Sequence, residues 1–437
     1  MADRTIAELH LAALPSLVPL VSAAALEGAR ALGFKEEDAG ALGVATEEVF
    51  SHLALSGAPG REVVIRILGS RWRAEVEIRF TPEHVDFRPF NLTFRTTPDD
   101  DPLLSRTALA IASQVVDRFR ISRRAEQILL SLTKERSFPK AAPPPPEPRP
   151  EGPVSARAAQ PHEFPLAAGL AAARYPAEQW PRAFESPEKV AGMAAAGDLG
   201  AVVAADAVGR LAGALFWLPA GARMAGLFGP FLFQDPPVEG VASLLLDAVV
   251  GSLARTGLEG LIARSPTSAL PSRAMEPLGT FEVPLADGTA RTVEARYRQL
   301  DEDPGGVAHV HPSVEAFVRD SFRQLSFGRV VRVVPGSPPS GDGGTAFATE
   351  VDRVAGQARL TPLWLGSDAR EMLRGLVDAL AADSFRRPLA ELDLGEPSHA
   401  GFAPALLEAG FVPRLILPWA GNGDVLLFQL AAETGRR

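Results

Sequence analysis

A carboxylate and an imidazole stand four residues apart in the stretch Glu47-Glu48-Val49-Phe50-Ser51-His52. On a helix this spacing places Glu48 and His52 on one face, about one turn from each other. A carboxylate in such a position can orient or deprotonate an attacking group. His52 offers a nitrogen that a hard cation such as Mg²⁺ accepts poorly, and a metal site would need further ligands nearby. The alternative is an ordinary pair on a helix surface.

The second half of the chain holds other candidates for chemistry. Gly240-Val241-Ala242 opens a strongly apolar helix, where backbone amides can bind phosphate groups. Glu259 and Glu282 are candidate general bases, although lone carboxylates at strand ends are usually solvated. His309 and His311 lie on one side of an extended segment, but a surface loop is favoured because no third metal ligand has a suitable spacing. No nucleophile elbow, intact Walker loop or zinc-protease motif is present.

Composition narrows the classes of protein. A chain of 437 residues, 46% hydrophobic and 22% charged, is expected to form two or three soluble domains. The net charge is -9 and the basic residues form no long run, so no nucleic-acid partner is expected. Cysteine is absent, which excludes thiol chemistry and suits a reducing compartment. No signal peptide or membrane span is predicted, and we expect a cytoplasmic protein.

Proline divides the chain. The run that begins at Pro143 predicts an extended linker over residues 138–161, with a docking ligand for an aromatic groove as the alternative. The elements expected before it are strands at 5–12, 63–68, 73–80 and 127–132 and helices at 17–32, 36–55 and 104–119.

The residues after the linker predict two successive α+β units, 162–305 and 306–437. The turns around Gly279 and Gly410 occupy corresponding places, which suggests a duplication. In the first unit we expect helices at 177–195, 241–254 and 272–278, with strands at 199–205, 211–218, 224–233, 258–263, 281–285 and 291–300.

Residues 5–135 resemble the anti-sigma regulatory factor branch of the histidine-kinase-like (GHKL) ATPases. The order of elements and the helix segment "ALGVATEEVFSHL" carry the resemblance, together with Asp117 and the ending "ILLSLTKE". The resemblance implies that Glu48 orients an attacking group and that the family's Asn, which holds Mg²⁺, is replaced by His52. It also implies a protein partner of the sigma-factor or anti-sigma-antagonist type, and a homodimer formed through this domain.

The nucleotide site departs from the family pattern at further places. Phe80-Thr81-Pro82 stands where the family has Asp-x-Gly, and Ser105-Arg106-Thr107-Ala108-Leu109 replaces a glycine-rich turn. Arg106 can still attract a phosphate, since a guanidinium can replace lost amide donors, but a solvated arginine is the simpler interpretation. We therefore expect the nucleotide-binding remnant Glu48, His52 and Arg106 to have lost ATPase activity. Residual ATP–Mg²⁺ binding stays open.

Residues from about 162 to 430 resemble GNAT acetyltransferases, in tandem. The run "MAGLFGPFLFQDPPVEGVASLLLDAVVGSLARTGLEGLIA" carries the resemblance, which implies acetyl-CoA binding at Gly240, Val241 and Ala242. Pro236 and Pro237 remove amide donors there, and Asp235 and Glu239 add negative charge. Met275 and Leu406 occupy the places where many family members have a general-acid Tyr. The segment ending in Ser367-Asp368 is not a phosphate loop, and either residue suits a helix N-cap.

The sequence thus predicts a mixed α/β (α+β) protein: a GHKL ATPase-like α/β sandwich followed by tandem GNAT-like units. The favoured function is regulation by protein or ligand binding without catalysis and without a firmly implied cofactor. The first alternative is an acyl-CoA-dependent N-acetyltransferase controlled by its N-terminal domain. The second is a serine/threonine kinase acting on an anti-sigma antagonist.

Overall fold

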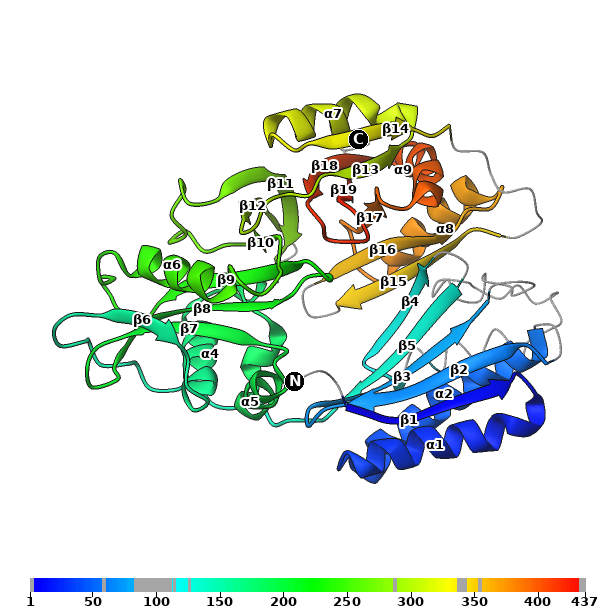
Figure 1. The fold of residues 1–437 in the computed structure, drawn as a ribbon, viewed down its shortest axis with the longest axis horizontal. Coiled ribbons are helices and arrows are strands. Elements are labelled where there is room, and N and C mark those ends of the chain that lie inside the picture. Colours follow the sequence, from blue (N-terminus) through cyan, green and yellow to red (C-terminus); the bar gives the residue numbers. More distant parts are fainter. Residues whose placement is uncertain are drawn as a thin grey trace.

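The structure, a computed structural model, describes residues 4–56, 60–81, 112, 115–124, 127–285, 289–335, 344–352 and 356–431. The fold is mixed α/β, as the sequence predicts. Within these residues the strands form sheets of five, seven, two and five strands (Figure 1). We refer to residues 4–136, 155–300 and 306–431 as the N-terminal, middle and C-terminal units. No helix of the described part has the length and apolar character needed to cross a membrane.

The N-terminal unit is a five-stranded sheet of order β1-β2-β3-β5-β4, with two helices on one face. The residue pattern of strand β3 explains why the helices cover only one face. Ala74, Val76 and Ile78 are buried against the helices, whereas charged residues alternate with them on the other face. The elements are β1 (Arg4–Ala12), α1 (Val18–Ala31), α2 (Glu36–Ser56), β2 (Glu62–Gly69), β3 (Arg73–Phe80), β4 (Arg118–Arg124) and β5 (Gln127–Glu135).

The middle unit has a seven-stranded sheet of order β11-β12-β10-β9-β8-β7-β6. Neighbouring strands are antiparallel except β9 and β10, which are parallel and connected through α6. Its elements are β6 (Ser155–Ala158), α4 (Glu163–Arg174), α5 (Pro187–Ala196), β7 (Gly200–Ala205), β8 (Leu211–Pro219), β9 (Met224–Leu232), α6 (Val241–Leu253), β10 (Gly260–Ala263), β11 (Glu276–Pro284) and β12 (Ala290–Gln299).

The C-terminal unit repeats part of this order. Its five-stranded sheet runs β15-β16-β17-β19-β18, and β16 and β17 are the parallel pair, connected through α8. The elements are β13 (Gly306–Val310), α7 (Glu315–Gln324), β14 (Arg329–Val333), β15 (Ala346–Asp352), β16 (Gln357–Trp364), α8 (Ala369–Ala382), β17 (Leu389–Asp393), α9 (Ala403–Glu408), β18 (Phe411–Leu417) and β19 (Val425–Leu430).

Several expected elements differ from the structure. The helix expected over 177–195 is two short 3-10 turns followed by α5, because prolines at 176, 181 and 187 interrupt it. The helix expected over 272–278 is absent, and β11 begins within that range. Strands β6, β13 and β14 were not expected. Most of the helix expected over 104–119 lies outside the described residues, and β4 begins at Arg118.

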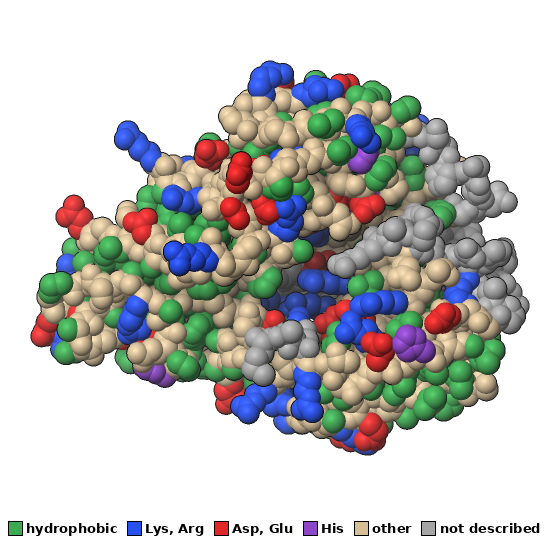
Figure 2. Space-filling model, in the orientation of Figure 1, with side chains coloured by type: hydrophobic (Ala, Val, Ile, Leu, Met, Phe, Trp, Pro, Cys, Tyr) green, Lys and Arg blue, Asp and Glu red, His purple; other side chains and the backbone are tan. Residues whose placement is uncertain are grey.

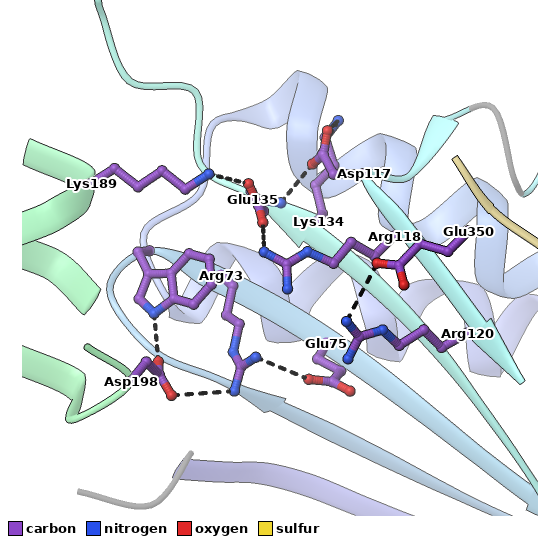
Figure 3. A network of polar contacts seen from close by, with 11 residues as sticks. Arg73, Glu75, Asp117, Arg118, Arg120, Lys134, Glu135, Lys189, Asp198 and Glu350 are labelled. Carbon is purple, nitrogen blue, oxygen red and sulfur yellow. Dashed lines mark hydrogen bonds and ion pairs between the residues drawn. The ribbon is translucent and has the colours of Figure 1, made fainter. Parts of the chain in front are cut away.

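Trp72 joins the N-terminal unit to the middle unit. It lies in the turn between β2 and β3, yet only 1% of its surface is exposed, because it packs among core residues of the middle unit such as Val190 and Met193. Its indole nitrogen donates a 2.7 Å hydrogen bond to Asp198 (Figure 3). A Cβ at Gly192 would lie 3.1 Å from the Trp72 Cβ, so α5 must present a glycine there.

Charged side chains surround this anchor. Arg73, Arg118 and Lys189 lie over the Trp72 ring at 5.1, 5.8 and 5.7 Å from its centroid. Glu135 at the end of β5 binds both Arg118 and Lys189, so it connects the two units. Figure 2 shows Lys and Arg side chains gathered in a hollow near the centre of this face of the molecule.

The middle and C-terminal units share a core and a buried charge cluster. The Arg329 side chain is 2% exposed and binds Asp303 at 2.7 Å and Asp424 at 2.6 Å. Trp419 lies between Arg329 and Arg223, whose guanidinium is 3.8 Å from the ring centroid. These contacts fix the two units against each other.

Trp72→Ala should loosen the N-terminal unit. Removing a buried indole costs about 3–5 kcal/mol in comparable sites, so we expect an earlier thermal transition and faster proteolysis between the units. Trp72→Phe, which keeps an aromatic ring but loses part of the buried volume and the bond to Asp198, should have a smaller effect. Differential scanning calorimetry and limited proteolysis measure both, and equal effects of the two variants would contradict the anchor.

The contact through Glu135 should weaken in acid. Burial raises the pKa of this carboxyl, but Arg118 and Lys189 more than offset it, so the pKa lies below its ordinary value. A lowered pKa stabilises the fold at pH values above the ordinary carboxyl pKa and is lost as pH falls through the folded pKa. The melting temperature should therefore fall below about pH 4.5, and less steeply in Glu135→Gln than in the wild type. Glu302→Gln, at an exposed position, should leave the slope unchanged.

Candidate functional site

The parallel strands β9 and β10 separate soon after they begin. They are paired only where Met224–Gly226 lies beside Gly260–Ile262. Strand β9 continues to Leu232, still paired with β8 on its other side, whereas β10 ends at Ala263. The edge of β9 beyond Gly226 therefore lacks a neighbouring strand. Its backbone groups need other partners, and a ligand with amide groups can bind such an edge as an added strand does.

Two side chains occupy this edge. The Thr267 hydroxyl donates to the Pro230 carbonyl at 2.7 Å, and the Thr267 amide to the Gly229 carbonyl at 3.4 Å. The Tyr175 hydroxyl accepts from the Leu232 amide at 2.7 Å and donates to the Leu232 carbonyl at 3.2 Å. Burial raises the pKa of Tyr175 above its ordinary value, so the hydroxyl keeps the proton that it donates. The carbonyls of Gly229, Pro230 and Leu232 and the amide of Leu232 thus have partners within the protein.

The segment after β9 is held as well. Arg174, next to Tyr175 at the end of α4, donates to the Phe233 carbonyl at 3.2 Å and the Gln234 carbonyl at 3.0 Å. Gln179 donates to the Pro266 carbonyl at 3.4 Å, which fastens the chain that carries Thr267. The segments that follow β9 and β10 are thus both held by one short region, 174–179.

The candidate phosphate loop lies at the start of α6. Gly240 is exposed, has a φ of 77°, and would have no heavy atom within 4 Å of an added Cβ. Val241 is buried and Ala242 half-buried. The loop before Gly240 exposes two prolines and two carboxylates, which supply no amide donors and repel phosphate: Asp235, Pro236, Pro237 and Glu239.

The two places expected for a general-acid Tyr are apolar and closed. Met275 is 3% exposed beside α6, and Leu406 is fully buried on α9. Tyr175 and Tyr297 are the two tyrosines of the chain. Tyr175 is used on β9, and Tyr297 on β12 packs edge-on against Phe327 at 5.5 Å.

The two candidate bases form ion pairs. Glu259 binds Arg223, which also stacks on Trp419. Glu282 binds Arg387, and its backbone exchanges two hydrogen bonds with the Gln429 side chain of the C-terminal unit, at 2.9 and 2.7 Å. The Glu282 carboxylate thus pairs across the two units, and the Glu259 carboxylate pairs with the arginine that stacks on Trp419 of the C-terminal unit.

The nucleotide remnant is only partly described. Glu48 is half-buried on α2, and His52 is 2% exposed, so the interpretation as an exposed surface pair is wrong. Helix α2 buries this face against the sheet. Phe80, at the end of β3, is also buried. Arg106 lies outside the described residues, and the structure brings no basic group to Glu48 that would mark a phosphate site within them.

The remaining candidates are explained by local contacts. Among the described residues no group of three or more His, Asp or Glu side chains is arranged to hold a metal. His309 lies 3.3 Å from the Leu394 carbonyl, and His311 2.8 Å from the Ser313 hydroxyl. Asp368 is the N-cap residue of α8, but its carboxylate accepts from the Thr345 amide at 2.6 Å instead of capping the helix.

Comparison with solved structures finds acetyltransferases. The chain is similar to a phosphinothricin acetyltransferase of the GNAT superfamily from Sinorhizobium meliloti, in complex with acetyl-CoA, with 20% identity over 35% of this chain and 90% of that one and a TM-score of 0.28. A variant spermidine N-acetyltransferase from Vibrio cholerae is 14% identical over 34% of this chain and 94% of that one, with a TM-score of 0.28. A GCN5-related N-acetyltransferase from Rhodopseudomonas palustris is 16% identical over 34% of this chain and 96% of that one, with a TM-score of 0.25. No family model and no curated protein matches the chain.

Sequence reasoning missed Tyr175, Thr267 and Arg174. None lies in a motif, and each acts on backbone groups more than 30 residues away, so no local pattern could reveal them. The one weak signal was the rarity of tyrosine, which made Tyr175 noticeable without indicating its contact.

Tyr175→Phe should open the edge of β9. The variant leaves the Leu232 amide and carbonyl without their partner, which costs about 1–3 kcal/mol for buried groups. We expect a lower melting temperature and faster hydrogen exchange at the Leu232 amide. The amide of Leu215, in the middle of β8, should exchange as in the wild type, and unchanged exchange at Leu232 would show that Tyr175 does not hold this edge.

Proposed function

We propose that the chain is a regulatory protein that acts by binding, and that its middle unit does not transfer acetyl groups. The observation that carries the proposal is the occupied edge of β9. An acyl-CoA arm that entered between the parted strands would have to displace Thr267 and Tyr175 from four backbone contacts. Each displaced buried group would then need a new partner.

The loop before α6 supports the same conclusion. Phosphate binding at a helix start depends on free amides and positive potential. Pro236 and Pro237 have no amide hydrogen, and Asp235 and Glu239 oppose the helix dipole. An acidic loop of this kind disfavours the phosphates of coenzyme A. Buried Met275 and Leu406 also leave no proton donor at the expected places.

The proposed partner of the N-terminal unit is a protein. The resemblance of residues 5–135 to anti-sigma regulatory factors supports a sigma factor or an anti-sigma antagonist. Because Trp72 fixes this unit to the middle unit, a partner bound to the N-terminal unit would meet a rigid assembly instead of a tethered domain.

The second candidate is an acyl-CoA-dependent N-acetyltransferase. One observation favours it: the parallel strands part, and the loop that follows β9 leads into α6 with Gly240 exposed and unobstructed. Activity would require that Tyr175 and Thr267 leave the edge when the ligand arrives.

A thermal-shift titration distinguishes the two candidates. A ligand at about 100 times its dissociation constant stabilises the native state by about 2.7 kcal/mol, which raises the melting temperature by several degrees. We expect no shift with millimolar acetyl-CoA, because the edge and the loop are closed to it. ATP–Mg²⁺, titrated in parallel, tests the remnant on α2.

Gly240→Glu is the control for specific binding, since it adds charge and bulk at the start of α6. A shift with acetyl-CoA that this variant abolishes would overturn the binding-only proposal. Transfer of the acetyl group to an amine, measured by release of free coenzyme A, would then establish the acetyltransferase.

A further inference from the structure

The proline-rich segment lies against the middle unit along its length. Between residues 143 and 150 the half-buried positions are Pro144, Glu147 and Pro150, and the residues between them are exposed. A repeat of three is the repeat of a polyproline II helix, and consecutive prolines favour that conformation. One edge of such a helix therefore rests on the protein.

The first half of the segment packs against α4 and the turn before α5. A Cβ at Gly169 would lie 3.1 and 3.2 Å from two ring atoms of Pro144, so glycine lets the proline approach the helix. The Ala141 amide donates to the Glu185 carbonyl at 3.1 Å, and Lys140 pairs with the Glu185 carboxylate at 2.6 Å.

The second half is received by the ends of β8 and β9. The Leu211 amide donates to the Glu147 carboxylate at 3.1 Å, and the Gln234 side chain, itself buried, donates to the Pro148 carbonyl at 3.4 Å. The Glu151 amide donates to Asp206 at 2.9 Å, which ends the docked segment.

A groove remains beside the prolines. It has a volume of about 440 Å³ and is lined by Pro143 and Pro144 on one side and by Trp180 and Phe184 on the other. The two aromatic rings are parallel within 1°, with centroids 6.3 Å apart. Aromatic side chains, a glycine that allows close approach and a side-chain donor to a proline carbonyl, here Gln234 to Pro148, are features that polyproline recognition uses.

We propose that the middle unit carries a polyproline-recognition groove and that residues 140–151 of the same chain are its intramolecular ligand. The groove binds the edge of the segment that Pro144, Glu147 and Pro150 form. A proline-rich segment of another protein with this pattern competes for the groove whenever the chain's own segment is released. The segment is thus a docked ligand as well as a connection between units.

Two variants of the proline-rich segment test which of its edges contacts the groove. Pro144→Asp changes a half-buried position and Pro145→Asp an exposed one, and both remove one proline from the same run. We expect Pro144→Asp to accelerate hydrogen exchange at the Ala141 and Glu151 amides about tenfold or more, since both amides are bonded only while the segment is docked. Pro145→Asp should match the wild type.

Binding in trans tests the groove itself. A synthetic peptide of residues 138–152 should bind the Pro144→Asp protein in isothermal titration calorimetry and bind the wild type at least tenfold more weakly, because the wild type's own segment occupies the place that the peptide would take. Adding Gly169→Leu to Pro144→Asp should abolish binding, since the leucine occupies the place of Pro144. Gly251→Leu, at an open helical position, is the matched control and should not.

Equal hydrogen exchange at these amides in Pro144→Asp and Pro145→Asp would overturn the proposal. Absence of peptide binding to the Pro144→Asp protein would overturn it as well. Peptide binding that survives Gly169→Leu would place the interaction elsewhere and overturn it too. Leucine is a good helix former, so α4 is expected to persist, and circular dichroism verifies this. None of these results depends on acetyl-CoA, so they are independent of the function proposed above.

Discussion

Beyond Gly226, strand β9 has no strand on one side, and its buried backbone groups must still be bonded. This constraint decides what the middle unit can do. If the groups stay open, the edge can receive a ligand, and the fold is equipped for chemistry between the strands. If side chains fill it, the same sheet becomes a closed structural element. Here Tyr175 and Thr267 bond backbone groups of this edge, which supports the binding role proposed above.

The attachment of the N-terminal unit follows a similar logic. A proline-rich run predicts an extended linker after the N-terminal unit, and the structure in addition buries Trp72 in the neighbouring core and surrounds it with charged side chains. A buried indole bound to Asp198 is a specific contact, because both the ring and its donor must be accommodated. The proline-rich segment adds a second attachment along the middle unit. The three units therefore respond together to whatever binds one of them.

The sequence predicts elements well where the pattern is local. The alternation in 73–80 predicted β3, and the apolar helix before residue 254 is α6. The edge strand β6 (SARA) carries too little apolar pattern to be recognised, and β14 is a run of only five residues. The prediction of a helix near Met275 was wrong because this apolar residue packs against α6, which is distant in the sequence, and does not belong to a helical pattern. Gly240 was identified because a glycine at a helix start has a local signature. The residues that close the site were not, since a tyrosine that bonds a strand 57 residues away has none.

Gln234 connects the closed edge with the docked segment. Its backbone carbonyl accepts from Arg174, beside Tyr175, while its side chain donates to the carbonyls of Glu147 and Pro148. If opening of the β9 edge displaces Gln234, docking of the proline-rich segment weakens with it. By linkage, release of that segment then makes opening of the edge less costly by the same free energy. We infer from these shared contacts of one buried amide that opening of the edge and docking of the segment oppose each other.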